Sequence, residues 1–385
     1  MLQEVSTTAA SSLGPCFLPH LLSSAVGAWE EEEGRKNPVP GPGGRWRREA
    51  WSCCLLTTRS FFIINSTSLV NKTDTHGTNI STLEFIFICF PEVHSWDLSG
   101  LLLFFLLVAL LSNVTLLVVI VIEPRLHHPM YYFLAMLSVV DICLSTVATP
   151  NILVMLWTGY TMVMANACFS QMFFINLFSA GESSIFLVMA YDRYVAICNP
   201  LHYPSIITKP FVAKAFVFIL VRNTAVALPM SLLAANLDYC SSRDILHCFC
   251  ENMSVEKLAC SDNTPSSIYG LVVFIVIGGS DLLLIVLSYF VILRTVVVAR
   301  SFSAASKAFR TCGSHLIVIC MFYITIATTM VSNRAVKEIP RPVHVVLSLL
   351  HQLLSPALNP LVYGILTKEI RHSVLRILGK IKVHP

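Results

Sequence analysis

Charged residues are scarce in this chain. Asp, Glu, Lys and Arg make up 12% of its 385 residues, whereas an ordinary soluble domain contains about 25%. Apolar residues make up 55%, and they gather in runs of about 20 residues, long enough to cross a hydrocarbon core about 30 Å thick. This composition excludes an ordinary soluble domain and predicts a membrane protein with several spans. The net charge of +4 is small and by itself says little about nucleic acid. We expect no nucleic-acid partner for a membrane protein of this kind.

Two kinds of motif are also missing from the chain. No Ser/His/Asp or HExxH arrangement is present, so the sequence does not support a membrane-embedded hydrolase. Secondary transporters usually show inverted repeats and broken helices, and neither pattern is visible. We therefore predict that the protein is not an enzyme and needs no cofactor or metal.

Seven apolar segments are present, and each one predicts a helix. A spanning segment in lipid must satisfy its own backbone hydrogen bonds, and strands would be shorter with alternating polarity. The expected spans are 98–122, 131–156, 168–194, 211–234, 268–298, 313–333 and 343–365. The sequence therefore predicts an all-α membrane protein, with a seven-transmembrane helix bundle over 98–365.

Basic residues set the expected orientation of these spans. The loops on one side hold most of the Lys and Arg, including Arg125, Arg300 and Lys368, so this side should face the cytosol. The segment 61–97 then lies on the outer, extracellular side, and we expect a protein of the plasma membrane. Three glycosylation sequons in that segment agree with this orientation. They are Asn65, Asn71 and Asn79.

The two ends of the chain differ from the bundle. Residues 1–60 include a charged, Pro/Gly-rich run at Glu30–Arg48 and lack the basic start of a cleavable signal peptide. We expect 1–60 to be a disordered extension. Residues 366–385 alternate apolar and basic side chains, which predicts a short cytoplasmic amphipathic helix and tail on anionic membrane lipid. Calmodulin binding would need the same pattern.

An acid, a base and an aromatic residue close the third span. Asp192, Arg193 and Tyr194 stand where a helix should meet water, because a charged pair is costly inside a bilayer. From the residues alone this is an ion pair at a helix end, in which Asp192 holds Arg193.

Strings around this ion pair and elsewhere resemble a known family. They are MAYDRYVAICNPLHY (189–203), PMYYFLAMLSVVD (129–141), SYFVIL (288–293), KAFRTCGSHLIVI (307–319) and SPALNPLVYGI (355–365). Over residues from about 85 to 380 the chain resembles the olfactory receptors of the rhodopsin-like G-protein-coupled family. HCFCENMSVEKLAC (247–260) resembles the class I, or fish-like, branch of these receptors.

The resemblance implies an odorant receptor. Such a receptor binds small volatile or short-chain organic molecules and activates a heterotrimeric stimulatory G protein that raises cAMP. The implied G-protein switch consists of Asp192, Arg193, Tyr194, Tyr289, Lys307, Arg310, Asn359, Pro360 and Tyr363. Anchoring on the positive inner side explains Lys307 and Arg310 equally well.

Polar residues at membrane depth form a second implied group. Asn113, Asp141 and Glu182, together with Asn359, would form an interior network that rearranges on activation. Two neighbouring carboxylates there need a shared proton or a cation such as sodium. Ordinary hydrogen bonding between helices is the alternative. Arg222 and Asp281 also lie within spans, and the sequence predicts no role for them.

The resemblance places the ligand between the outer halves of the third, fifth, sixth and seventh helices. The candidate lining residues are Asn176, Ser179, Ala180, Val273, Ile277, Tyr323, Thr329, Met330, Arg334 and Leu349. Ordinary helix packing is the alternative for most of them. Arg334 either anchors a ligand carboxylate or is a charge at the rim, and a volatile apolar or weakly polar ligand is at least an equal expectation.

Four cysteines fall in the expected outer loop between the fourth and fifth helices, where the compartment is oxidising. They are Cys240, Cys248, Cys250 and Cys260. The resemblance implies the disulfides Cys168–Cys250 and Cys240–Cys260 and leaves Cys248 over. A metal site at His247, Cys248 and Cys250 is the rival interpretation, although its spacing lacks a fourth ligand. Asn252-Met-Ser in this loop is a further sequon.

Overall fold

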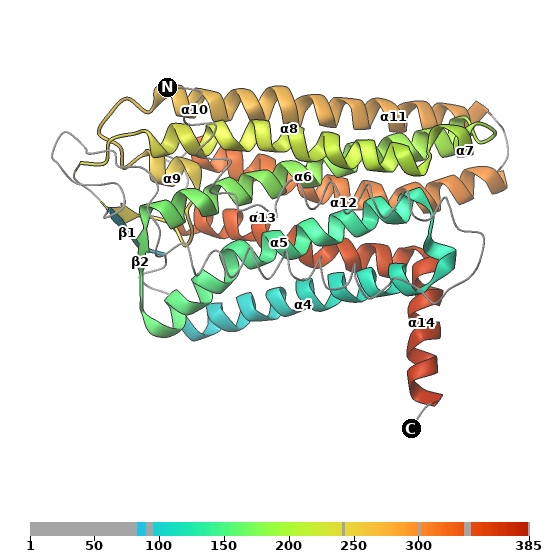
Figure 1. Ribbon diagram of the computed structural model, residues 1–385, viewed down its shortest axis with the longest axis horizontal. Helices are drawn as coiled ribbons and strands as arrows, with labels where there is room; N and C mark the ends of the chain where they lie inside the picture. The colour runs from blue at the N-terminus through green and yellow to red at the C-terminus, as the bar shows by residue number, and fades with distance from the viewer. Residues whose placement is uncertain (1–82, 90–94, 241–242, 299–301, 335–339, 384–385) are drawn as a thin grey trace.

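The computed structural model describes residues 83–89, 95–240, 243–298, 302–334 and 340–383. Within them seven long helices lie side by side in one bundle (Figure 1). Their bounds are α4 Ser95–Ile122, α5 Pro129–Thr158, α6 Ala165–Cys198, α8 Lys209–Ala235, α10 Thr264–Val272 continued by η4 Val273–Gly278 and α11 Gly279–Val298, α12 Phe302–Arg334, and α13 Arg341–Leu366. Each is long and apolar enough to cross a membrane, so the predicted seven-helix bundle is confirmed.

Local sequence signals account for where several of these helices begin and end. Pro129 and Pro210 stand in the first turns of α5 and α8, where a proline costs no helical hydrogen bond. Thr208 caps α8 by accepting a hydrogen bond of 3.4 Å from Phe211 N. Helix α5 is followed by Gly159, whose φ of 69° lies in the left-handed region that favours glycine.

Two helices depart from the expected spans. Helix α12 begins at Phe302 instead of near 313, because its first turns carry polar residues that a search for apolar runs does not count. The span Thr264–Val298 contains the π-helical turn η4, Val273–Gly278. A π-helical turn holds an extra residue, so it changes which side chains of this span face the bundle. Two predicted ligand residues, Val273 and Ile277, lie in that turn.

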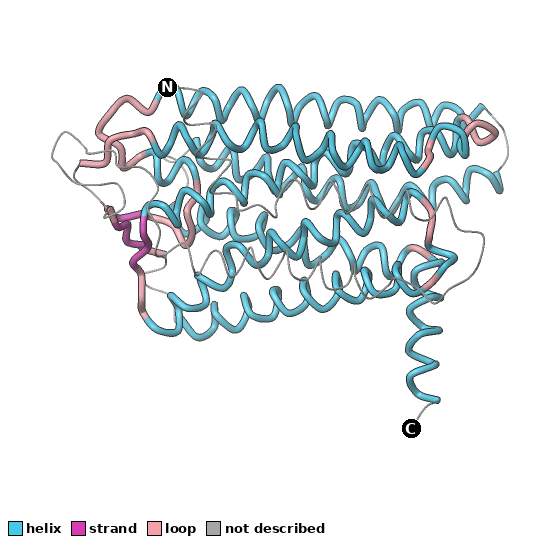
Figure 2. Tube along the Cα trace, viewed as in Figure 1, coloured by secondary structure: helices cyan, strands magenta, loops and turns pink. Residues whose placement is uncertain are grey.

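A small sheet, which the sequence did not predict, lies at one end of the helical bundle. Strand β1 (Glu84–Phe87) lies between β2 (Met162–Met164), which runs antiparallel to it, and β3 (Asp244–Ile245), which runs parallel. Figure 2 shows the strands together at this end, which we call the sheet end. Phe85 is fully buried and packs edge-on against Tyr239, with ring centroids 5.2 Å apart. The segment just before the first span is thus part of the folded structure.

The opposite end of the bundle carries a helix that leaves it at a steep angle, α14 (Lys368–Val383; Figure 1). We call this the α14 end. Ile370 is buried, and Arg376 forms an ion pair of 3.3 Å with Glu123. This helix is the amphipathic eighth helix that the sequence predicts. The short helices are η3 (Pro124–Leu126), α7 (Tyr203–Ile206) and α9 (Asn252–Glu256).

Candidate functional site

The charged end of α6 lies at the α14 end of the bundle. Arg193 Nε donates a hydrogen bond of 2.9 Å to Asp192 Oδ2, and a second guanidinium nitrogen contacts the same oxygen. Tyr203 of α7, which is absent from the predicted switch, donates a bond of 2.8 Å to Asp192 Oδ1. Burial and the Asp192 carboxylate raise the pKa of Tyr203, so its hydroxyl stays protonated. Asp192 is fully buried, and both of its oxygens hold neighbours in place.

Three tyrosines of the predicted switch lie at this end. Tyr194 and Tyr289 pack in one apolar cluster with Cys312 of α12. Tyr363 of α13 is fully buried and packs edge-on against His315, with ring centroids 5.4 Å apart. The hydroxyl groups of Tyr289 and Tyr363 are buried and have no hydrogen-bond partner among the described residues.

The other predicted switch residues lie on α12 and α13. Lys307 and Arg310 belong to the first turns of α12, and their side chains fall outside what the structure describes. Pro360 lies inside α13, next to the buried Asn359. Of these four residues, the structure thus describes the side chains of Asn359 and Pro360 only.

The predicted interior network comes together inside the bundle. Asn359 Nδ2 donates to both Asp141 oxygens, at 3.2 and 3.3 Å, and lies 3.4 Å from Glu182 Oε1. Ser355, which was not predicted, donates to the same Glu182 oxygen at 3.0 Å. Asn113 Nδ2 donates to a backbone carbonyl of α13 at 2.8 Å. All four predicted residues are at most 1% exposed, and they tie α4, α5, α6 and α13 together.

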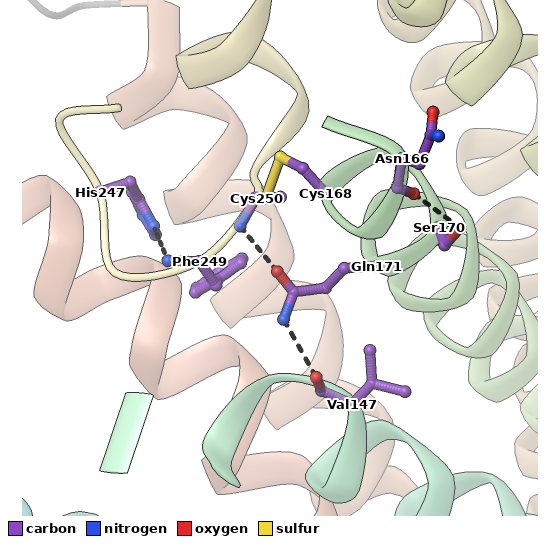
Figure 3. The surroundings of a disulfide bond; sticks show 8 residues. All are labelled: Val147, Asn166, Cys168, Ser170, Gln171, His247, Phe249 and Cys250. Carbon is purple, nitrogen blue, oxygen red and sulfur yellow. Dashed lines mark hydrogen bonds between the residues drawn. A yellow bond between two sulfur atoms is a disulfide. The ribbon is translucent and has the colours of Figure 1, made fainter. Parts of the chain in front are cut away.

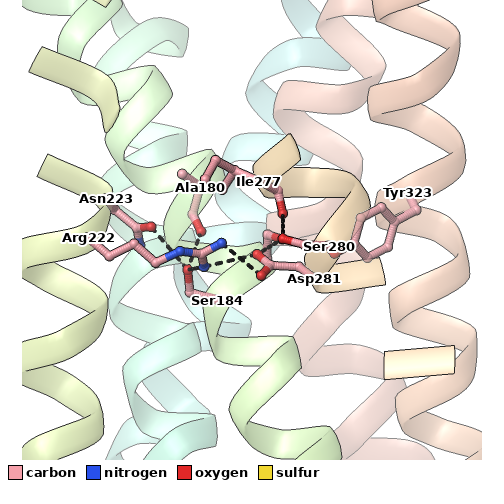
Figure 4. A network of polar contacts seen from close by, with 9 residues as sticks. Ala180, Ser184, Arg222, Asn223, Ile277, Ser280, Asp281 and Tyr323 are labelled. Atoms are coloured by element: carbon pink, nitrogen blue, oxygen red, sulfur yellow. Dashed lines mark hydrogen bonds and ion pairs between the residues drawn. The ribbon is translucent and has the colours of Figure 1, made fainter. Parts of the chain in front are cut away.

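A second polar cluster, which sequence reasoning did not assemble, joins α6, α8, α11 and α12 (Figure 4). Arg222 of α8 forms a two-pronged ion pair with Asp281 of α11, with N–O distances of 2.8 and 3.0 Å. Ser183 of α6 donates to Asp281 at 2.9 Å and lies 2.9 Å from the Tyr323 hydroxyl. Ser184 accepts from Arg222 at 2.8 Å. Two opposite charges at membrane depth were the signal for this pair, because each needs a partner there.

The predicted ligand residues lie along the sheet-end halves of their helices. Seven are half-buried: Asn176, Ser179, Ala180, Val273, Ile277, Tyr323 and Met330. Thr329 and Leu349 are buried, and Thr329 donates hydrogen bonds of 2.9 and 3.3 Å to backbone carbonyls of α12 and α13. Tyr323 belongs to the second polar cluster as well, so that cluster lies next to the candidate ligand region.

Arg334 lies exposed at the rim of the sheet end. Its guanidinium is 3.5 Å from the Ser267 carbonyl oxygen. Burial raises the pKa of Glu256 in α9 to about 6, while a 2.5 Å hydrogen bond from Ser266 and the charge of Arg334 act against this shift. Arg334 therefore already has a hydrogen-bond acceptor within the protein, the Ser267 carbonyl oxygen.

A disulfide ties α6 to the loop that follows α8 (Figure 3). Cys168 bonds to Cys250, the pair that the resemblance implies. Gln171 of α6 accepts a hydrogen bond of 3.0 Å from Cys250 N and donates one of 3.0 Å to the Val147 carbonyl oxygen of α5. The loop is thus fixed to two helices. The other implied pair, Cys240–Cys260, is also a disulfide.

The expectation that Cys248 is left without a disulfide partner is wrong. Cys248 bonds to Cys89, which follows β1 and lies 159 residues away in the sequence. Sequence reasoning considered only the loop and the start of α6 as sources of partners, so it missed Cys89. The same finding overturns the metal site at His247, Cys248 and Cys250, because a cysteine in a disulfide cannot serve as a thiolate ligand.

The remaining sequence predictions concern the N-terminal part of the chain. The extension 1–60 and the sequons at Asn65, Asn71 and Asn79 lie outside the described residues. The sequon at Asn252 is described, and its side-chain nitrogen is buried.

Seven spans in one bundle, with a charged end on the third, are the arrangement found in the rhodopsin-like fold. The crystal structure of squid rhodopsin matches with a TM-score of 0.63 over 77% of this chain and 88% of its own, at 15% identity, and so shares the fold. The family model for olfactory receptors matches residues 102–381. Human olfactory receptor 56A4 is 46% identical over 77% of this chain and 96% of its own length, and human olfactory receptor 56A1 is 45% identical over 79% and 96%. The chain belongs to the olfactory receptor family, and it is a multi-pass membrane receptor, not an enzyme.

Proposed function

We propose that this receptor lies in the plasma membrane with its sheet end outside the cell, binds small volatile or short-chain organic molecules, and activates a stimulatory G protein that raises cAMP. Basic residues support this orientation, because Arg371, Arg376 and further Lys and Arg gather at the α14 end. Disulfides at the sheet end agree, since they persist in oxidising compartments. In this orientation α14 lies on the anionic inner leaflet, with lipid as its partner.

The observation that carries the signalling proposal is the contact of Arg193 and Tyr203 with Asp192. While Asp192 holds the guanidinium, Arg193 is kept from other partners. A movement of α12 away from α6 would uncover Arg193 and admit a G-protein helix between them. The buried Tyr289 hydroxyl then offers Arg193 a new partner. The Asp192–Arg193 pair is thus the closed state of a two-state switch.

The interior network couples this switch to the ligand site. Asp141 and Glu182 share Asn359 as a donor, and a shared proton or a sodium ion neutralises one of the two carboxylates. Pro360 lacks a backbone N–H, so α13 can bend next to this cluster. Bending of α13 rearranges the network and passes the change to α6.

Neutral odorants are the ligand class that we favour over carboxylates. Arg334 already donates a hydrogen bond to the Ser267 carbonyl oxygen, so it is not reserved for a ligand carboxylate. The Arg334→Ala variant should leave responses to neutral odorants unchanged. Loss of responses to acids alone would instead support a carboxylate anchor at Arg334.

A cAMP assay tests the proposal in cells that express the chain with a stimulatory G protein and a trafficking helper. The panel contains short-chain acids, aldehydes, alcohols and terpenoids, and surface expression is measured in parallel. Arg193→Ala should abolish the response at unchanged surface expression. Tyr203→Phe keeps Arg193 but removes one bond to Asp192, so it should raise basal cAMP. A full response from Arg193→Ala at equal surface level would contradict the switch.

A further inference from the structure

Two side-chain amides meet where the outer loop touches α6. Asn176 Nδ2 of α6 donates a hydrogen bond of 2.8 Å to the Met172 carbonyl oxygen and one of 2.9 Å to Asn252 Oδ1. Asn252 is the first residue of α9 and follows Cys250 by two positions. The amide of Asn252 therefore reaches from the loop into the region of the candidate ligand residues.

The backbone fixes which way both amides point. A carbonyl oxygen only accepts hydrogen bonds, so the group of Asn176 that faces the Met172 carbonyl must be its nitrogen. The same nitrogen faces Asn252, so the oxygen of Asn252 must face Asn176. Asn252 Nδ2 is left as a donor that points elsewhere. It is buried, and no described residue accepts a hydrogen bond from it.

This nitrogen is also the atom to which an N-linked glycan would attach at the Asn252-Met-Ser sequon. Because Nδ2 is buried, Asn252 is not available to a transferase in the folded receptor. A buried donor without a partner is costly and rare in folded proteins. Asn252 Nδ2 is therefore available to an acceptor that the described residues do not supply.

The neighbours of Asn252 hold it in a fixed position. The Cys168–Cys250 disulfide and Gln171 fasten the preceding residues to α6. Glu251 caps α9 by accepting a hydrogen bond of 2.9 Å from Ser254 N. The donor is therefore set in place before a ligand arrives, which reduces the ordering cost of binding.

We propose that Asn252 Nδ2 donates a hydrogen bond to an oxygen atom of the odorant, and that this receptor selects oxygenated ligands with an acceptor, such as ketones, aldehydes and esters, over hydrocarbons of the same shape. The inference rests on the proposed ligand site, since Asn176 is one of its candidate lining residues. Sequence reasoning counted Asn252 only as a sequon. As a ligand contact, Asn252 would add a fixed hydrogen-bond donor to a region lined by both apolar and polar side chains.

The test compares ketones with alkenes of the same carbon number. The Asn252→Asp variant keeps the shape, still accepts from Asn176 and has no donor. It should raise the half-maximal concentration for ketones about tenfold, the effect of one hydrogen bond, and leave alkene responses unchanged. Primary amines should gain potency, because the second carboxylate oxygen accepts from them. Ser254→Ala is the matched control, because it also destroys the sequon but keeps the donor.

A second readout separates this inference from the signalling proposal. The unfolding temperature of the purified receptor is measured with and without each odorant, for wild type, Asn252→Asp and Asn252→Leu. If ketones stabilise the wild-type receptor but neither variant, with no cAMP response in any of them, the result would support ketone binding by Asn252 Nδ2. The same result would overturn the proposed G-protein activation. Equal ketone responses in wild type and both variants would show that the Asn252 donor does not contribute to ketone binding, and would overturn the inference while reception stands. Absence of both responses in wild type would overturn both.

Discussion

Arg222 and Asp281 form an ion pair inside the bundle. The Asp281 side chain is 3% exposed and that of Arg222 is 16% exposed, so each charge depends on its partner and on the serines of α6. A buried ion pair gains little over well-packed apolar residues, but removal of one partner leaves an uncompensated charge. The pair therefore specifies how α8 and α11 pack against α6.

We predict that Arg222→Leu or Asp281→Leu alone destabilises the receptor by about 3–5 kcal/mol. The double variant removes both charges and should recover most of that loss. Thermal unfolding of the detergent-solubilised receptor, with surface expression alongside, measures the effect. A double variant as unstable as the sum of the single variants would show that the two charges do not act as a pair.

Glu256 should make the outer loop sensitive to pH. Its pKa is raised from the ordinary value of 4.5 to about 6, mainly by burial. The folded loop therefore binds more protons than the unfolded chain between these values, and its stability falls as pH rises through this window. Above about pH 6, Glu256 is ionised in both the folded and the unfolded chain, so it no longer makes the stability depend on pH. Hydrogen exchange of α9 and α10, corrected for the intrinsic rate, should show this loss between pH 4.5 and 6.

Glu256→Gln provides the control for that measurement. The amide does not titrate and can still bond to Ser266, so the pH slope in α9 and α10 should disappear. Glu251 and Arg334 also act on Glu256. If the pH dependence survives in Glu256→Gln, another group causes it, and the assignment to Glu256 is wrong.

The spans could be predicted because each one carries its own signal. An apolar run such as Leu98–Ile122 needs no knowledge of the other helices. The sheet could not be predicted, since its strands have two to four residues and pair segments far apart in the sequence. The Cys89–Cys248 bond depends on that same pairing. Likewise, the charge of Arg222 indicates that it needs a partner, but which residue that is depends on which helices become neighbours. The interior network could be predicted, because the family resemblance implies it.

We predict that Cys89→Ser and Cys248→Ser each lower stability by about 2–4 kcal/mol. Each variant breaks the bond that fastens β1 to the outer loop. The double variant should lose no more than the single variants, because all three lack the same bond. Peptide mapping under non-reducing conditions identifies the bond, and thermal unfolding gives its effect. Cys320→Ser, at an exposed free cysteine, should change neither the Cys89–Cys248 bond nor the thermal unfolding.

Helix α6 connects every candidate site in the receptor. Cys168 fastens the outer loop, and Asn176 meets the amide of that loop. Glu182 and Ser183, one residue apart, enter the two polar clusters on different sides. Arg193 closes the α14 end. Packed and hydrogen-bonded contacts thus run along α6 from the proposed ligand site to the proposed switch.

The first 60 residues should be dispensable for this route. The family model begins at residue 102, and human olfactory receptor 56A4 is matched over 96% of its own length by 300 residues of this chain. Deletion of residues 2–60 keeps β1, Cys89 and the three N-terminal sequons. We expect surface expression and odorant potency within about twofold of the full chain, as measured by flow cytometry and cAMP.

Deletion of residues 2–60 together with 83–90 provides the contrast, because it also removes β1 and Cys89 but keeps the three sequons. Cys248 then loses its partner and the buried Phe85 no longer packs against Tyr239, so surface expression should fall well below that of the shorter deletion. Equal losses from the two deletions would mean that residues 2–60 contribute to folding or export. Equal retention would mean that the sheet and its disulfide are not needed to hold the outer loop in place.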